Sequence, residues 1–303
     1  MIHVLVSFDE NYMQHTQVML YSLCKHTKES VKVWLLNLKL TDEQCAACKR
    51  FIERKCGAEL KIIDMDPSMF RGMPTCGFSI ECYSRIMAPN ALPKELSRVL
   101  WLYGDIIVNN DVAPFYHQEL GDKYCVACKD NWADTEHIKT YQVALGIPNT
   151  HEYFNSGVLL LNLEILRRNI TLDDIQSAFV KLKDAIHFPD QDILNYLYTG
   201  HVKYADNLLY NCQRFGKKEE KQVQYDQVVI LHYTGIRKPW DVRFLDKRAK
   251  YYWKMYVQCG GIGHALHCAA FYIGGGLFSV ADSFMRTCCR GLYDKIKGKV
   301  LGV

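Results

Sequence analysis

The feature that most constrains the fold of this chain is an alternation of short apolar runs with helix-like segments. Near the start, strand-like runs at 3–8, 31–38 and 59–65 are separated by helical apolar spacing at 12–26 and 41–56. Strands that alternate with helices of this length are typical of βαβ units, whose strands pair in parallel. The sequence therefore predicts a doubly wound α/β sheet.

The same alternation continues through the middle of the chain. A helix is expected at 79–88, ended by Pro89, and a long strand at 98–108 follows it. Further strands are expected at 124–131, 157–162 and 228–233, and further helices at 172–187, 190–198 and 247–257. We find no internal repeat.

Composition places the chain among ordinary globular proteins, because 49% of its 303 residues are hydrophobic and 23% are charged. The net charge of +4 comes from 37 basic and 33 acidic residues that are well mixed. This charge is too small to predict a nucleic-acid partner. No secretory signal is expected, because residues 1–6 enter a strand-like run without a basic region or a cleavage site.

The chain has 13 cysteines, most of them inside predicted helices or strands. Two CxxC pairs occur, Cys45/Cys48 in a predicted helix and Cys125/Cys128 in a predicted strand. A zinc site needs four ligands that converge, usually from tight turns. We therefore expect reduced cysteines that pack as small apolar residues, and a cytoplasmic protein.

The composition changes after Val257. Residues 255–281 contain no Asp, Glu, Lys or Arg, and residues 282–303 are basic and amphipathic. Glycines, together with His264 and His267, dilute the apolar stretch too much for a membrane-spanning helix. Two alternatives remain: the tail attaches to an anionic membrane surface, or it forms a helical hairpin packed on the main domain.

The ends of the predicted strands carry the polar residues of interest, because ligands of doubly wound sheets bind beyond the carboxyl ends of the strands. Asp9-Glu10-Asn11 follows the first strand, and Tyr103-Gly104-Asp105 interrupts the strand at 98–108. The chain has no GxxxxGK[ST] motif, and no GxGxxG follows its first strand. A P-loop enzyme and a nicotinamide oxidoreductase are therefore not supported.

Five segments, in this order, resemble glycosyltransferase family 8, the group of bacterial galactosyltransferases and glycogenin-like enzymes. They are 6–12, 83–86, 100–108, 153–163, and 190–195 together with 230–235 and 238–240. The resemblance covers residues 1–257 as a catalytic domain and leaves 258–303 as an appendage. It implies a GT-A fold: a Rossmann-like mixed sheet flanked by helices, here with a C-terminal helical appendage.

The activity that this resemblance implies is retaining transfer of glucose or galactose. The donor would be a UDP-sugar, and the acceptor a glycan hydroxyl in cell-surface glycan synthesis, such as that of lipopolysaccharide. Acceptor pockets in this fold are built from variable loops, here 66–77 and 130–146. The enzyme would be cytoplasmic and peripheral on the inner face of the membrane, which it would contact through 258–303.

The resemblance also assigns roles to single residues. Asp9 and Asn11 would hold uracil and ribose, and Arg85 would bind phosphate or sugar hydroxyls. The remaining nucleotide-sugar contacts would come from Tyr103, Gly104, Gly235 and Lys238.

The catalytic residues would be Asn155, Asp190 and Gln191, which surround the donor sugar. Asp105 and His232 would ligate Mn²⁺ or Mg²⁺, which assists the departure of UDP. Each of these residues also has a structural alternative. Asp190 could be only a helix cap, His232 only a core histidine, and Asn155-Ser156-Gly157 only a turn.

Tyr103 departs from the family pattern, because it replaces the first carboxylate of a DxD pair. A hard divalent cation prefers charged oxygen ligands, and a phenol is mostly neutral at pH 7. Three alternatives follow: a looser metal site, catalysis without metal through Arg85 and Lys238, or binding of a nucleotide sugar without turnover. We favour the first, because Asp105 and His232 are retained.

Overall fold

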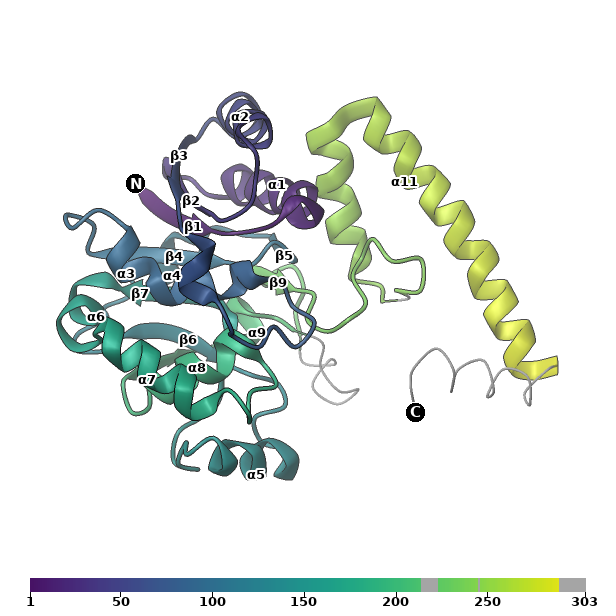
Figure 1. Ribbon diagram of the computed structural model, residues 1–303. Helices are drawn as coiled ribbons and strands as arrows, with labels where there is room; N and C mark the ends of the chain where they lie inside the picture. Colours follow the sequence, from purple (N-terminus) through teal and green to yellow (C-terminus); the bar gives the residue numbers. More distant parts are fainter. Residues whose placement is uncertain (214–222, 245, 289–303) are drawn as a thin grey trace. The chain divides into compact units, whose positions relative to one another are not determined.

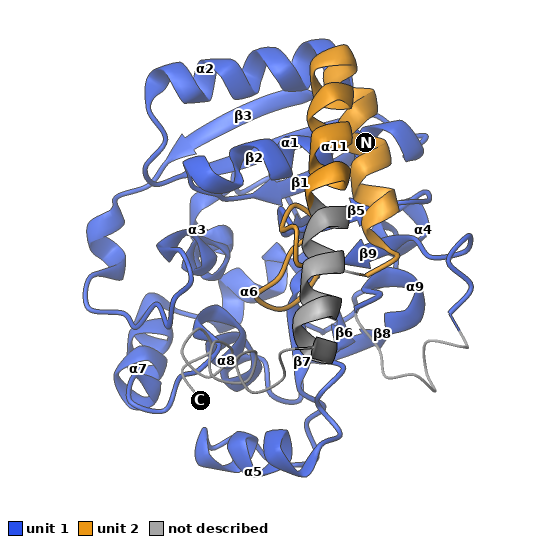
Figure 2. Cartoon of the chain, turned by 90° about the vertical axis from the view of Figure 1, so that its right-hand side faces the viewer, with its two compact units in different colours: residues 1–232 blue, residues 233–303 orange. Residues whose placement is uncertain are grey.

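The structure, a computed structural model, describes residues 1–213, 223–244 and 246–288 (Figure 1). The chain divides into two compact units, Met1–His232 and Tyr233–Val303 (Figure 2). The part of the predicted basic tail at 289–303 lies outside the described residues.

The first unit contains a seven-stranded sheet in the order β3-β2-β1-β4-β7-β6-β8. Its strands are β1 (Ile2–Val6), β2 (Val31–Asn37), β3 (Glu59–Asp64), β4 (Arg98–Leu102), β6 (Cys125–Lys129), β7 (Phe154–Asn162) and β8 (Val202–Ala205). A separate two-stranded sheet pairs β5 (Ile106–Val108) with β9 (Ile230–His232).

The helices follow the strands in the predicted alternation. The α-helices are α1 (Glu10–His26), α2 (Asp42–Phe51), α3 (Ala88–Ala91), α4 (Ala113–Tyr116), α5 (Glu136–Ala144), α6 (Leu163–Asn169), α7 (Leu172–Leu182), α8 (Pro189–Leu197), α9 (Asn207–Tyr210) and α11 (Ala249–Cys288). A π-helical turn, η1 (Ile52–Cys56), extends α2, and two 3₁₀ segments occur at η2 (Pro67–Phe70) and η3 (Ile80–Met87).

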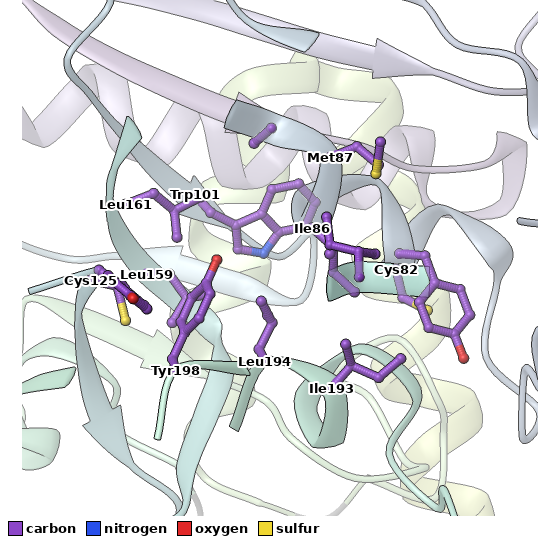
Figure 3. Packing of buried hydrophobic residues seen from close by; sticks show 14 of the residues in the cluster. Cys82, Ile86, Met87, Trp101, Cys125, Leu159, Leu161, Ile193, Leu194 and Tyr198 are labelled. Atoms are coloured by element: carbon purple, nitrogen blue, oxygen red, sulfur yellow. The ribbon is translucent and has the colours of Figure 1, made fainter. Parts of the chain in front are cut away.

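Both faces of the central sheet are buried. Along β4, Val99 and Trp101 belong to one apolar cluster, and Leu100 and Leu102 belong to a second. Because successive strand residues point to opposite faces, the two clusters lie on the two sides of the sheet. Residues of η3, α6, α7 and α8 contribute to the first cluster, and residues of α1, α2 and α4 to the second. Figure 3 shows the first cluster around Trp101, with Ile86, Leu159, Leu161 and Leu194.

The prediction of a mixed α/β sheet flanked by helices is confirmed, but the expectation of uniformly parallel strands is wrong at β7. This strand pairs antiparallel with both β4 and β6. All of its residues are buried, so its mainly apolar sequence resembles that of a strand inside a parallel sheet.

Two further elements differ from the prediction. The strand expected at 98–108 breaks at 103–105, and its second half joins the small sheet instead of the large one. The helix expected at 79–88 is 3₁₀, and Pro89 lies in the first turn of α3 instead of ending a helix. Proline is tolerated there because the first turn of a helix does not use its backbone N–H groups.

Arg167 of α6 fixes the segment between α3 and β4. Its guanidinium donates to five backbone carbonyls at distances of 2.8 to 3.1 Å, those of Pro89, Leu92, Pro93, Lys94 and Leu96. The five N–H donors of arginine are held in a rigid fork, so one side chain orders the whole connection.

The second unit contains a helical hairpin. Helix α11 is interrupted at Gly261, whose φ of 67° and ψ of −144° are not helical. The two arms pack together: the rings of Tyr256 and His264 stack at 4.0 Å, and those of Trp253 and Phe271 lie 4.4 Å apart. Within the described ranges, no helix combines the length and apolarity needed to cross a membrane.

Candidate active site

Polar residues converge at one edge of the large sheet because of its topology. The carboxyl ends of β1, β4 and β6 meet there, and the amino end of β7 joins them because this strand runs the opposite way. Asp9, the segment 103–105, Asp130 and the segment 155–157 therefore lie at a common edge.

A bulge in β7 shapes this edge. The register between β6 and β7 shifts so that Ala127 faces Leu159 and the next residue, Cys128, faces Asn155. The residues in between, 156–158, are extra on the β7 side. Bulges re-aim side chains and are frequent beside active sites. Here the bulge turns Ser156 and its neighbours toward the amino end of α8.

Asp190 is held by side chains from three other elements. Its Oδ2 accepts a hydrogen bond from Ser156 Oγ at 2.7 Å and forms an ion pair with Arg85 Nη1 at 3.1 Å. The Tyr103 hydroxyl lies 3.1 Å from Oδ1 and 3.2 Å from Oδ2. The cap of α8 is Phe188, so the alternative that Asp190 is merely a helix cap is wrong.

Arg85 is fully buried and packs against two aromatic rings. Its guanidinium carbon lies 4.2 Å from the ring centre of Trp101 and 4.0 Å from that of Tyr103. Its Nε donates to the carbonyl of Cys82 at 3.0 Å, and its Nη1 donates to that of Ser156 at 2.5 Å. The cation is therefore paired inside the protein, with Asp190 as its counter-ion.

Tyr103 does not present its hydroxyl as a charged ligand. Burial raises the pKa of the Tyr103 phenol well above its ordinary value, while nearby Arg85 opposes this rise. The phenol remains protonated at neutral pH and donates to the Asp190 carboxylate.

A second network joins the other residues expected near the sugar. Gln191 Oε1 accepts from Asn155 Nδ2 at 3.1 Å and from the backbone N–H of Ser156 at 3.0 Å. Asn155 Nδ2 also donates to Asp130 Oδ2 at 3.1 Å. Asn155 and Gln191 are 7% and 8% exposed, so both side chains are largely buried at this end of the sheet.

Asp105 directly precedes β5 of the small sheet, and His232 lies opposite on β9, where it pairs with Ile106. His232 Nε2 is 3.3 Å from Asp105 Oδ1, and His232 Nδ1 is 2.8 Å from Asn211 Oδ1. Asn211 Nδ2 donates in turn to Asn155 Oδ1 at 3.0 Å. A chain of hydrogen bonds thus links this pair to the residues around Gln191.

Gly157 allows this arrangement by its lack of a side chain. A Cβ at this position would lie 2.3 Å from His232 Cε1 and 2.6 Å from Tyr103 Cδ2. Both distances are shorter than real Cβ contacts, so only glycine permits the two rings to approach this closely.

The neighbours of Asp105 on α1 do not supply positive charge at neutral pH. Burial lowers the pKa of His15 to about 4, although Asp105 opposes this shift. Burial, with Asp105 and Asp9, raises the pKa of the Tyr12 phenol. Both side chains are therefore neutral at pH 7.

The pair of Asp105 and His232 fits a divalent cation only in part. Two ligands at right angles on an ion with bonds of about 2.1 Å lie about 3 Å apart, close to the observed spacing of their donor atoms. Among the residues that the structure describes, however, no group of three or more His, Cys, Asp and Glu side chains could hold a metal ion. In the described part of the chain, Asp105 and His232 thus form a two-ligand site, and Tyr103 does not add a charged third ligand.

The residues expected at the nucleotide lie after β1 and β4. Asp9 caps α1 through a hydrogen bond from the Tyr12 backbone N–H at 3.1 Å, and its other oxygen accepts from Asn11 Nδ2 at 3.2 Å. Asn11 is exposed. A Cβ at Gly104 would lie 2.4 Å from Thr16 Oγ1, so glycine lets the strand end approach α1.

Gly235 and Lys238 belong to the second unit. Gly235 has a φ of 92°, a left-handed conformation that favours glycine. Lys238 Nζ donates to the carbonyl of Tyr233 at 2.7 Å. The network described above is built from residues of the first unit alone.

Three residues of the network were missed in the sequence. Asp130 directly follows β6, so the same strand-end rule that selected Asp9 would have found it. Ser156 was noted only as part of a turn. Asn211 carries no sequence signal, because its contact with His232 depends on the pairing of β5 with β9.

Comparisons with known proteins agree with this geometry. A family model described as glycosyl transferase family 8 matches residues 3–243. Lipopolysaccharide 1,2-glucosyltransferase of Escherichia coli is 27% identical over 248 residues, which cover 77% of this chain and 71% of that protein.

Two solved structures share the fold. The galactosyltransferase LgtC, in complex with donor and acceptor sugar analogs, has a TM-score of 0.72 and 24% identity, covering 84% of this chain and 95% of that one. The glycosyltransferase GlyE of Streptococcus pneumoniae TIGR4 has a TM-score of 0.62 and 21% identity, covering 84% of this chain and 60% of that one.

Proposed function

The chain belongs to glycosyl transferase family 8 and has a GT-A fold, and on this premise we propose that it transfers glucose or galactose from a UDP-sugar to a glycan hydroxyl with retention. The names of two similar proteins support the proposal of a hexose donor and a glycan acceptor. One is a lipopolysaccharide glucosyltransferase, and the other is a galactosyltransferase solved with donor and acceptor sugar analogs. The acceptor would be a cell-surface glycan, contacted through the loops at 66–77 and 130–146.

The observation that carries the proposal is the connected polar network at one sheet edge. Asp190 and Gln191, adjacent on α8, enter this network through different partners, Tyr103 and Asn155. In our assignment, Asp190 binds hydroxyls of the donor sugar, and Gln191 lies on the face opposite the leaving group, next to Asn155. Fixed side chains of this kind hold reacting groups in place before reaction, which lowers the entropic part of the barrier.

The nucleotide would bind beyond the ends of β1 and β4. Asp9 and the exposed Asn11 would recognise uracil and ribose, because a carboxylate and an amide offer both acceptors and donors. Gly235 and Lys238 would contact the diphosphate. Arg85 would contribute through its field, since its guanidinium is engaged with Asp190.

Asp105 and His232 would hold Mn²⁺ or Mg²⁺, with the donor diphosphate supplying further oxygen ligands. Such a cation, when bound, offsets the negative charge that develops on departing UDP. The 3.3 Å spacing of the two donor atoms supports this assignment.

We further propose that the enzyme is cytoplasmic and attaches to the anionic inner face of the membrane through residues 258–303. The second arm of the hairpin supports this, because Ile262, Leu266 and Ile273 are 82%, 68% and 68% exposed. Apolar side chains of this kind, followed by a basic sequence, favour an anionic lipid surface.

One observation favours a second function, binding of a nucleotide sugar without turnover. Tyr103 occupies the position of a metal-binding carboxylate, and its hydroxyl is committed to Asp190. A cation held by two protein ligands would be weaker, and the protein would then act through a partner.

Release of UDP from UDP-glucose and UDP-galactose, measured while Mn²⁺ is titrated from zero, separates the two functions. The enzyme should release UDP in a metal-dependent manner, and Asp105→Asn should abolish this release. Asp122→Asn, at an exposed carboxylate outside the site, is the matched control and should behave as the wild type. Tyr103→Asp should tighten Mn²⁺ binding, and release by neither the wild type nor Tyr103→Asp would leave only the binding function.

A further inference from the structure

Tyr103 is the position at which this chain departs from the family pattern, and its side chain is fixed at both ends. Its hydroxyl lies 3.1 and 3.2 Å from the two oxygens of Asp190. Its ring stacks on the guanidinium of Arg85 at 4.0 Å and meets the edge of Trp101 at 6.0 Å. A side chain held this way is partly buried, and its hydroxyl points toward Asp190 on α8.

The carboxylate of Asp190 depends on this phenol for its orientation. Oδ2 also receives Ser156 Oγ and Arg85 Nη1, and the Tyr103 hydroxyl reaches Oδ1 as well, at 3.1 Å. Hydrogen bonds on both oxygens fix the rotation of the carboxyl group about its terminal bond. Without the phenol, Oδ2 would keep Ser156 and Arg85 while Oδ1 would lose this hydrogen bond, so the carboxyl group would be held less firmly.

An aspartate in place of Tyr103 would act differently on the same neighbour. It would bring a second negative charge to a region where Asp190 is only 3% exposed, and like charges repel strongly where water is excluded. A neutral phenol instead offers a donor. Tyrosine at position 103 thus favours a neighbouring carboxylate, whereas the aspartate of the family pattern would favour a cation.

We propose that Tyr103 is a positioning residue that fixes the Asp190 carboxylate for recognition of the donor sugar, and that it is not a ligand of a metal or of the nucleotide. This inference rests on the proposed function, in which Asp190 binds the sugar. It implies that residue 103 controls how strongly the protein distinguishes a UDP-sugar from UDP.

Calorimetric titration of UDP and of UDP-glucose or UDP-galactose, without acceptor, tests the proposal. Tyr103→Phe keeps the ring that stacks on Arg85 and removes only the hydroxyl. It should weaken binding of the UDP-sugar about ten-fold, the effect of one hydrogen bond to a charged group, and leave UDP and Mn²⁺ affinities unchanged. Tyr204→Phe is the matched control, because it removes a hydroxyl on β8 that donates to the Glu152 carbonyl; it should leave the affinities for UDP-sugar, UDP and Mn²⁺ unchanged.

A double-mutant cycle shows whether Tyr103 acts through Asp190. In an Asp190→Asn background, the effect of Tyr103→Phe on UDP-sugar affinity should shrink to two-fold or less, because the charged acceptor is gone. Equal losses for UDP and UDP-sugar, an unchanged affinity for UDP-sugar, or additive effects in the cycle would each overturn the proposal.

The same variants separate this proposal from the proposed function. If the wild type binds neither UDP nor a UDP-sugar, the proposed function fails, and sugar recognition by Tyr103 fails with it. In that case the Tm of the wild type, the two single variants and the double variant is measured by thermal unfolding. If the shifts in Tm of the single variants do not add up to that of the double variant, Tyr103 still positions Asp190. Additive shifts would remove that role as well.

Discussion

Replacing Gly157 with alanine tests the candidate site where strand β7 meets two aromatic side chains. The added Cβ would lie 2.3 Å from His232 Cε1 and 2.6 Å from Tyr103 Cδ2. Ordinary contact begins at 3.4 Å, so the imidazole must move from 2.3 to 3.4 Å, by about 1.1 Å, if the backbone stays in place. Gly157 has no positive φ, so alanine adds only this steric conflict.

The cost follows from what the imidazole holds. A shift of this size breaks the 2.8 Å hydrogen bond between His232 Nδ1 and Asn211 or separates Nε2 from Asp105. Overpacking of a dense region costs about 1 to 3 kcal/mol, and an unpaired buried polar group costs about 1 to 3 kcal/mol more. We expect the free energy of unfolding to fall by about 2 to 6 kcal/mol in total.

Two measurements check this prediction. Thermal unfolding should show a Tm at least about 4 °C lower in Gly157→Ala. Electron paramagnetic resonance of free Mn²⁺ should show weaker binding, because the Asp105–His232 pair is disturbed. Gly263→Ala is the control: it lies in the second arm of α11 with no heavy atom within 4 Å of the added Cβ, and alanine is there neutral or stabilising by up to about 1 kcal/mol.

The reasoning would be refuted by a Gly157→Ala protein with the Tm of the wild type. Such a result would mean that Tyr103 and His232 are not held against β7. A lower Tm with unchanged Mn²⁺ binding would instead retain the steric argument and reject Asp105 and His232 as the cation site.

Three further predictions concern other parts of the molecule. Arg167→Lys should lower the free energy of unfolding by about 2 kcal/mol in denaturant titrations, because lysine cannot reach the five carbonyls of segment 89–96 together; an unchanged midpoint would contradict this. The pKa of His15 is lowered from 6.5 to about 4, so its contribution to stability is present above pH 6.5 and is lost as the pH falls toward 4. The Tm of His15→Gln should therefore fall less steeply than that of the wild type between pH 6.5 and pH 4. Parallel curves of Tm against pH for the two proteins would reject the shift. The full chain should co-sediment with anionic vesicles, less so at high salt, and Ile262→Ser with Leu266→Ser should reduce this binding, whereas equal sedimentation would argue against an interfacial hairpin.

The sequence predicts those elements whose signals are local. The helix at 41–56 was placed by its capping box, in which Thr41 and Gln44 exchange hydrogen bonds, and it ends at Gly57 with a φ of 62°. The first three strands were equally clear, because helices with an apolar face separate them. Asp9, Asp105 and Asn155 were found because they lie at strand ends or in family segments.

The rest depends on contacts between distant segments. The apolar run at 98–108 continues on both sides of Tyr103, so its sequence does not indicate that β5 pairs with β9 instead of extending the large sheet. Tyr103 and Asp190 are 87 residues apart, and their hydrogen bond depends on the reversed direction of β7 and on the bulge that turns Ser156 toward α8. Local periodicity in the sequence predicts neither the direction of β7 nor its bulge.

The small sheet of β5 and β9 affects which backbone hydrogen bonds of the molecule open first. Only three residue pairs form this ladder, and it joins residues 106–108 to 230–232, so a long loop must close before it can form. Short ladders of this kind exchange their amide hydrogens by local opening, at less cost than the large sheet. Asp105 and His232 are held together by this ladder, so a bound cation or donor would have to keep it closed. Slower amide exchange at Ile106–Val108 and Ile230–His232 would then report ligand binding while the central strands remain unchanged.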